Sequence, residues 1–120
     1  MKLESRKLLV DAVDAGSAVA ENISGRTFID YRDTRALRHA VEREFEIIGE
    51  ALNRLSDQDP ATAEQIPELR RAVDFRNRII HGYDTVDDEA VWDIAQVHLP
   101  VLVKRLGELL NPPPAPKTPN

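Results

Sequence analysis

The sequence contains no cysteine, so it can form neither a disulfide bond nor a thiolate zinc site. Its five glycines are scattered, which excludes a glycine-rich phosphate-binding loop. No apolar run approaches the roughly 20 residues that a membrane span needs. The N-terminal stretch MKLESRKLLVDAVDAG has charges among its apolar positions and is not a signal peptide. We therefore expect a cytoplasmic protein with no membrane contact.

The overall charge is acidic, with a formal net charge of −5. This balance argues against a protein that coats nucleic acid by bulk electrostatic attraction. A local basic cluster nevertheless stands out, because Arg70, Arg71, Arg76 and Arg78 fall within nine positions. On charge alone, the cluster fits either a solvated helix face or a local anion-binding site.

The spacing of apolar residues predicts an all-α protein. Apolar positions recur every three or four residues over about 3–24, 33–55, 67–81 and 88–110, and no segment alternates as a strand would. RTFIDY is predicted to be a link, and SDQDPATAEQIP a loop closed by Pro67 at the first helical position. We expect four principal antiparallel helices in an up-down bundle.

Particular residues predict where these helices end or approach each other. Gly25 is a plausible stop for the first helix, and Gly82 a left-handed cap for the third. Asp87 or Asp88 is expected to cap the start of the last helix. Gly49 lies inside the second helix, where glycine is unfavourable, and therefore indicates close approach of another helix.

The last helix and the residues after it carry two further predictions. Pro100 removes a backbone donor, so the helix should bend there. The second half of the helix is apolar on nearly every side, which predicts that part of it packs against a second copy in a homodimer. Five of the eight prolines fall in the last ten residues, so 111–120 should be an extended tail beside a domain of 1–110.

Most common catalytic devices are missing from the sequence. His39, His81 and His98 stand alone in three segments, without the spacing of a zinc site. A cluster of acidic residues just after the third helix is explained better by helix capping than by metal binding. No serine has the context of a nucleophile elbow. We therefore expect neither a metal nor another cofactor.

The remaining candidate site is RNRIIHGY, residues 76–83. Asn77 and His81 are four apart and share a helix face, and the long side chain of Arg76 can swing toward them. The helix end favours the charged form of His81, which suits a general acid. Arg76 and Arg78 have the right shape to bind a phosphoryl group.

Together these residues fit RNA cleavage by internal attack of the 2′-hydroxyl, without a metal. His81 would transfer protons, Arg76 would stabilise the pentavalent phosphorane, and Asn77 would orient His81 or the phosphate. Each residue also has an ordinary explanation: a surface arginine, a histidine or asparagine bonded to the helix end, and a packed tyrosine at Tyr83.

RNRIIHGY resembles the Arg-x4-His-x-Tyr motif of the HEPN superfamily, in its HepT-like branch of toxin–antitoxin systems. EREFEIIGEALNRLS is similar to the second helix of that branch, and VDDEAVWDIAQVHLPVL to its last helix. The resemblance covers roughly 3–110 and is sharpest at 74–83.

The resemblance implies a homodimeric helical endoribonuclease toxin in which two Arg–His sets meet in a cleft at the dimer interface. It also implies an antitoxin of the MntA type, a minimal nucleotidyltransferase that transfers AMP to the motif tyrosine. On this chain the catalytic pair would be Arg76 and His81. Asn77 and Arg78 would support catalysis or bind substrate, and Tyr83 would be modified.

A second hypothesis is a non-catalytic helical module that pairs with a nucleotidyltransferase and helps to hold its substrate. The intact Arg-x4-His pattern favours the ribonuclease, because a pure binding partner has no need of that pair.

Overall fold

The computed structural model describes residues 1–82 and 86–112. These residues form helices and contain no strand, which confirms the predicted all-α class. Tyr83 and most of the proline-rich tail lie outside the described residues, so the predictions made for them are not addressed by the structure.

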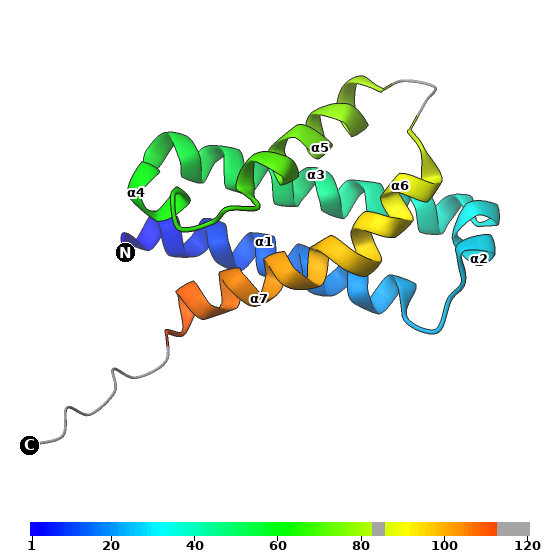
Figure 1. The fold of residues 1–120 in the computed structure, drawn as a ribbon, viewed down its shortest axis with the longest axis horizontal. Coiled ribbons are helices and arrows are strands. Elements are labelled where there is room, and N and C mark those ends of the chain that lie inside the picture. The colour runs from blue at the N-terminus through cyan, green and yellow to red at the C-terminus, as the bar shows by residue number, and fades with distance from the viewer. Residues whose placement is uncertain (83–85, 113–120) are drawn as a thin grey trace, which may run out of the picture.

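Four principal helices run in alternate directions along the molecule (Figure 1). Helix α3 packs antiparallel to α1, α5 packs on the outer side of α3, and the last helix packs along α1. The elements are α1 (Leu3–Ile23), α2 (Phe28–Asp33), α3 (Arg35–Gln58), α4 (Pro60–Ala63), α5 (Leu69–His81), α6 (Asp88–Asp93), η1 (Ile94–His98) and α7 (Leu99–Leu110). The predicted up-down arrangement therefore holds, with α6, η1 and α7 forming one continuous last helix.

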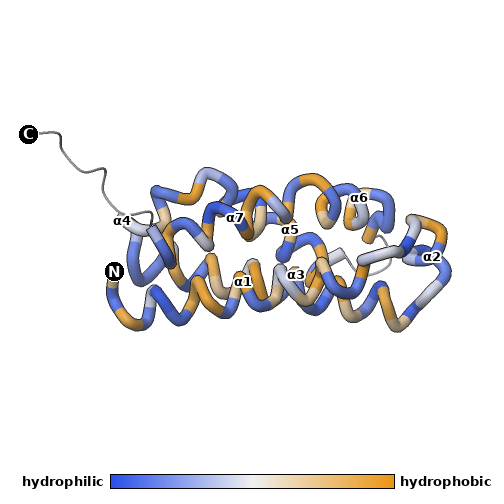
Figure 2. Tube along the Cα trace, turned by 90° about the horizontal axis from the view of Figure 1, so that it is seen from below, coloured by the Kyte–Doolittle hydropathy of each residue, from blue (hydrophilic) through white to orange (hydrophobic). Residues whose placement is uncertain are grey.

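The core forms because each principal helix buries one stripe of apolar side chains. Apolar and polar residues interleave along every helix, as the colouring in Figure 2 shows. The rings of Phe45 in α3 and Phe75 in α5 meet edge to face, with centroids 5.1 Å apart. Other fully buried side chains are Leu9, Val19, Tyr31, Val41, Ile48, Leu52, Leu55, Val91 and Leu106. The Phe45–Phe75 contact anchors α5 on α3.

Several predicted helix ends are confirmed. Gly25 has a φ of 72° directly after α1, a conformation that favours glycine. The side chain of Asp87 accepts hydrogen bonds from the backbone N–H groups of Glu89 and Ala90 at the start of α6. At the other end of the last helix, Arg6 Nη1 donates to the carbonyl of Leu110 over 3.0 Å. The last helix is thus capped at both ends.

Two segments predicted to be non-helical contain short helices. RTFIDY includes the start of α2, which Thr27 and Asp30 begin with a reciprocal capping box. The predicted loop after α3 includes α4, whose first turn is capped by Asp59. Helices of four to six residues are too short to show an apolar period, so only their capping residues indicate them in the sequence. The prediction that Pro67 opens the third helix is also wrong, because α5 begins at Leu69.

The prediction that Gly82 adopts a left-handed conformation is wrong. Its φ is −76°, in the right-handed region. Glycine is nevertheless needed there, because a Cβ at Gly82 would collide with the carbonyl oxygen of Arg78. Close approach of the backbone, and not its handedness, explains this residue.

Pro100 follows a π-helical turn. The N–H of Leu99 bonds the carbonyl of Ile94, five residues back, which identifies η1 as a wide turn. A wider turn accommodates the proline ring, which would press on the carbonyl of Gln96 in an α-helix. The structure therefore has a widened turn one turn ahead of the proline, and the bend expected at Pro100 stays a prediction. Within the part of the chain that the structure describes, no helix is both long and apolar enough to cross a membrane.

Candidate active site

Helix α5 carries the predicted site residues because only one of its faces is apolar. Val73, Phe75 and Ile79 are buried against the rest of the protein. Arg78 and His81 lie in its last turn and are exposed. Arg76 and Asn77 are half-buried, between the apolar stripe and the solvent. The helix therefore anchors itself by its stripe and presents the polar residues of the motif at its C-terminal end.

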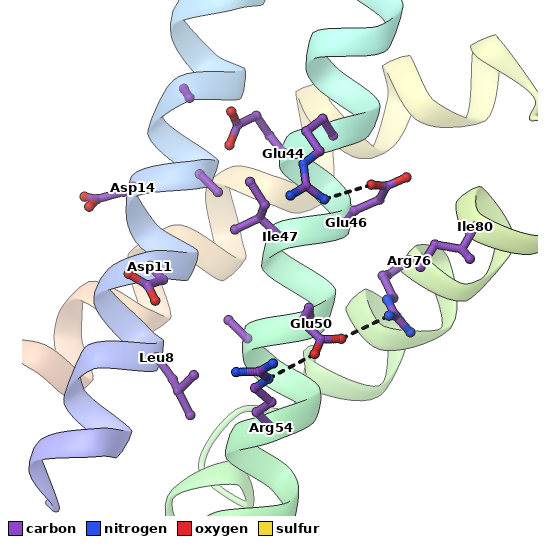
Figure 3. A pocket seen from close by; sticks show the side chains of 14 residues that line it. Leu8, Asp11, Asp14, Glu44, Glu46, Ile47, Glu50, Arg54, Arg76 and Ile80 are labelled. Atoms are coloured by element: carbon purple, nitrogen blue, oxygen red, sulfur yellow. Dashed lines mark hydrogen bonds and ion pairs between the residues drawn. The ribbon is translucent and has the colours of Figure 1, made fainter.

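The guanidinium of Arg76 is held by two neighbours, Glu50, which Figure 3 shows, and Asn77. Its Nη2 donates to Oε2 of Glu50 and its Nη1 to Oδ1 of Asn77, each over 3.0 Å. The Arg76 side chain is 25% exposed. The aliphatic stem of Arg76, formed by its methylene groups, lies against Gly49, where an added Cβ would come within 2.7 Å of Arg76 Cγ. The prediction that Gly49 marks close helix approach is confirmed, and the approaching group is the stem of Arg76.

Arg76 faces an open cleft between α1, α3 and α5. The cleft has a volume of about 730 Å³ and also contains Ile80 from α5. Its acidic side chains outnumber its basic ones: Asp11, Asp14, Glu44, Glu46 and Glu50 against Arg43, Arg54 and Arg76. The cleft of an isolated protomer therefore has an excess of negative charge, which disfavours an RNA phosphate.

His81 faces a different hollow, between the end of α5 and the start of α6. This hollow of about 530 Å³ is lined by Asn77 and Arg78 as well, and by Asp87 and Ala90 from the far side. The prediction that Asn77 and His81 share one side of the helix is supported by this shared lining. Arg78 and His81 therefore sit together at the rim of a hollow large enough for a nucleotide, which the carboxylates of Asp74 and Asp87 also line.

Arg76 and His81 are not brought together within one protomer. They are five residues apart, which turns them by about 140° around α5. The expectation that Arg76 swings toward the face of Asn77 and His81 is met at Asn77, whose Oδ1 accepts from Arg76 Nη1. Arg76 also bonds Glu50, and it lines a different hollow from His81. Asn77 is the link, since it bonds Arg76 and lines the hollow of His81.

A third hollow, of about 350 Å³, separates α5 from the last helix and is largely apolar. Phe45 and Phe75 are among its apolar lining residues, and Arg71 Nη1 lies 3.0 Å from His98 Nδ1 beside it. Val101 also lines it and is 51% exposed, and Val97, one turn earlier, is 56% exposed. Part of the apolar surface predicted on the last helix is therefore uncovered in the single protomer.

Sequence reasoning missed Glu50 as part of the site. The residue lies inside the IIGEA run, and its signal was the adjacent glycine, which already predicted a close neighbour. Of the two tyrosines, Tyr31 is fully buried. Burial, with the carboxylate of Glu42 second, raises the pKa of its hydroxyl well above the usual 10. Tyr31 is therefore closed to modification in the folded protein.

Comparison with known proteins places the chain among ribonucleases. A family model described as "Ribonuclease HepT-like" matches residues 14–109. A candidate RNase of Methanocaldococcus jannaschii is 26% identical over 92% of this chain and 90% of its own length. A candidate RNase of Caldanaerobacter subterraneus is 29% identical over 76% of this chain and 80% of its own. A probable ribonuclease HepT of Thermococcus cleftensis is 28% identical over 91% of this chain and 98% of its own.

No solved structure matches the chain significantly. The family match covers most of the described residues, including α5 with its Arg-x4-His motif. The chain therefore belongs to the HepT-like ribonuclease family, and its enzyme class is that of a ribonuclease.

Proposed function

We propose that this protein is the ribonuclease toxin of a toxin–antitoxin pair, an endonuclease that cleaves RNA without a metal ion. The observation that carries the proposal is the arrangement at the end of α5. Arg76 is held by Glu50 and Asn77, and Asn77 also lines the hollow that contains Arg78 and His81. A guanidinium can stabilise the charge of the transition state of phosphodiester cleavage and an imidazole can transfer its protons, once two copies of the chain bring these groups to one phosphate.

The proposed reaction is an internal transfer at phosphorus. The 2′-oxygen of the RNA attacks the adjacent phosphorus and loses its proton to one imidazole. The bond from phosphorus to the 5′-oxygen breaks, and that oxygen takes a proton from a second imidazole. Arg76 stabilises the charge of the pentavalent phosphorane. The products are a 2′,3′-cyclic phosphate and a 5′-hydroxyl end.

A homodimer would present an arginine and a histidine to the same phosphate, which one protomer does not. Arg76 and His81 face different hollows, so a single chain does not present both to one phosphate. A two-fold axis near the end of α5 would bring each Arg76 toward the partner's His81 and provide two imidazoles. The uncovered surface at Val97 and Val101 is available for such a contact.

Regulation by AMP transfer is the second part of the proposal. The hydroxyl of Tyr83 would attack the α-phosphorus of ATP in a minimal nucleotidyltransferase, releasing pyrophosphate and the phenolic proton. Tyr83 follows His81 by two residues, so the added AMP would bring a negative phosphate and a purine to the His81 hollow. Charge repulsion and occlusion would both exclude RNA.

The test is the purified protein on total RNA, with and without EDTA. Cleavage that survives EDTA and leaves cyclic phosphate ends is the expected result. Since loss of a general acid costs on the order of 10² to 10⁴ in rate, His81→Ala should be nearly inactive. A His81→Ala variant as fast as wild type would favour the non-catalytic binding module instead.

A further inference from the structure

The most constrained polar side chain near the candidate site is Arg76. Its stem fits against Gly49, and its guanidinium contacts a carboxylate on one nitrogen and an amide oxygen on another. Its Nε is buried and has no hydrogen-bond partner among the described residues. A surface arginine normally keeps its freedom to rotate. The fixed direction of this one calls for an explanation.

Glu50 is the centre of that arrangement. Its Oε1 accepts from Nε of Arg54 and its Oε2 from Nη2 of Arg76, each over 3.0 Å (Figure 3). One carboxylate is therefore shared between two guanidinium groups, and the three side chains together carry a net charge of +1. Glu50 fixes Arg76 without cancelling the positive charge of the group. Glu46, one turn earlier on α3 and labelled in Figure 3, is paired with Arg43 instead.

The pairing does not serve stability in any obvious way. Glu50 is 42% exposed, and its partners Arg54 and Arg76 are 62% and 25% exposed, so water and salt reach both ion pairs and limit what each contributes to folding. Orientation is a better explanation, since each terminal nitrogen of Arg76 has two N–H groups and one on each remains for another acceptor. A phosphate could occupy these in the bidentate geometry that arginine favours.

We propose that Glu50 is a positioning residue for the cleavage reaction. Its carboxylate holds the guanidinium of Arg76 in the orientation in which that guanidinium contacts the phosphorane, and Gly49 leaves room for the aliphatic part of the Arg76 side chain. The inference rests on the proposed ribonuclease function and deepens it. Glu50 need not touch RNA, and its effect passes entirely through Arg76. Misplacing a charge-stabilising group by about 1 Å can cost on the order of 100-fold in rate.

The test compares Glu50→Gln with Glu46→Gln. Both substitutions remove one carboxylate charge from α3 in the same cleft, but only Glu50 contacts Arg76. We expect Glu50→Gln to lower kcat by roughly 10- to 100-fold, with RNA binding, measured by fluorescence anisotropy, and the melting temperature close to wild type. Glu46→Gln should leave all three measurements near wild type. An unchanged or increased kcat in Glu50→Gln would overturn the proposal, and so would an equal loss in Glu46→Gln.

A second measurement does not depend on activity. In protein labelled with ¹⁵N, the buried Nε–H of Arg76 should give a distinct NMR signal, assigned by its absence in Arg76→Lys. The signal should broaden or shift in Glu50→Gln and stay in place in Glu46→Gln. If wild-type protein cut no RNA, the ribonuclease proposal would fail, and this signal alone would decide whether Glu50 fixes Arg76. An unchanged signal in Glu50→Gln would show that it does not.

Discussion

Arg76 and His81 project from one helix, α5, yet they line two separate hollows on different sides of it. Asn77 lies between them and bonds only the first, over 3.0 Å to Nη1. A cleavage reaction that uses both residues on one phosphate therefore requires a second protomer.

We expect a stable homodimer that uses the last helix and α5. Val101→Asp places a charge on the uncovered surface of the last helix, so it should dissociate the dimer and abolish cleavage while keeping the helical circular dichroism of wild type. Val10→Asp, on the partly exposed Val10 of α1, is the matched control and should remain dimeric. Light scattering at micromolar concentration measures the mass. A monomeric wild type that still cuts RNA would contradict the two-copy site.

Arg76→Lys should recover little of the activity lost in Arg76→Ala. Lysine keeps the charge but cannot contact Glu50, Asn77 and a phosphate at once, because it lacks the planar fork of arginine. We expect both variants to lose on the order of 10² to 10³ in kcat, as when one charge-stabilising donor is removed. Single-turnover cleavage of a short RNA measures this. Wild-type rates in Arg76→Lys would mean that a point charge suffices.

Tyr83→Phe should keep nuclease activity and escape neutralisation by a partner nucleotidyltransferase. The phenol has no part in the proposed cleavage, in which two imidazoles carry out both proton transfers. After co-expression with such a partner, mass spectrometry should place AMP on Tyr83, because Tyr31 is fully buried. Adducts on Tyr31 alone, or full neutralisation of Tyr83→Phe, would show that the acceptor lies elsewhere.

Gly49→Ala should destabilise the protein, because the new methyl group would overlap the stem of Arg76. Overpacking of this kind typically costs about 1 to 3 kcal/mol. Gly107→Ala in α7 is the control, since its Cβ would meet nothing within 4 Å, and alanine there should be neutral or stabilising by up to about 1 kcal/mol. Chemical denaturation monitored by circular dichroism compares the two variants. Equal stabilities would mean that Arg76 moves aside at little cost.

Asp59 should make the stability depend on pH in the acid range. Hydrogen bonds from Thr62 and Ser5 lower the pKa of its carboxyl from 3.8 to about 2 in the folded protein. Because the folded pKa lies below the unfolded one, its contribution is present above about pH 4 and is lost as the pH falls toward 2.

Melting temperatures from pH 7 to pH 2 check this prediction. Asp59→Asn should melt below wild type at neutral pH, and the difference should shrink toward pH 2. Asp57→Asn, at an exposed position two residues earlier, should be close to wild type at neutral pH. A difference between Asp59→Asn and wild type that does not change with pH would rule out the carboxylate as its source.

Much of the fold could be predicted because long amphipathic helices leave a strong pattern. α1 and α3 each repeat their apolar stripe over more than 20 residues, so small errors at their ends do not hide them. The short α2 and α4 left no such pattern. The π turn left no clear pattern either. Buried Val91, Ala95 and Leu99 are spaced by four, a spacing that α-helices also use, although in a regular α-helix the third residue would be turned by about 80° from the first.

The candidate site was predictable as residue types but not as geometry. The motif placed Arg76 and His81 on one helix, and the helical period already separates them by about 140°. What holds Arg76 on its side of α5 is Glu50, a residue 26 positions earlier. A contact between distant helices has no period in the sequence, so only the glycine beside Glu50 hinted at it.

The π turn η1 lets the last helix hold one residue more than a regular α-helix would between the same two ends. Removing one residue from 94–98 would let the segment close into a regular α-helix, with Asp87 still capping its start. Leu99 would then follow Val91 by seven residues, within about 20° of two full turns. Leu102 and Leu106 would therefore stay in the core. The same deletion inside α7 has no wide turn to close and would rotate every later side chain by about 100°. The wide turn is thus the place where this helix tolerates the loss of a residue.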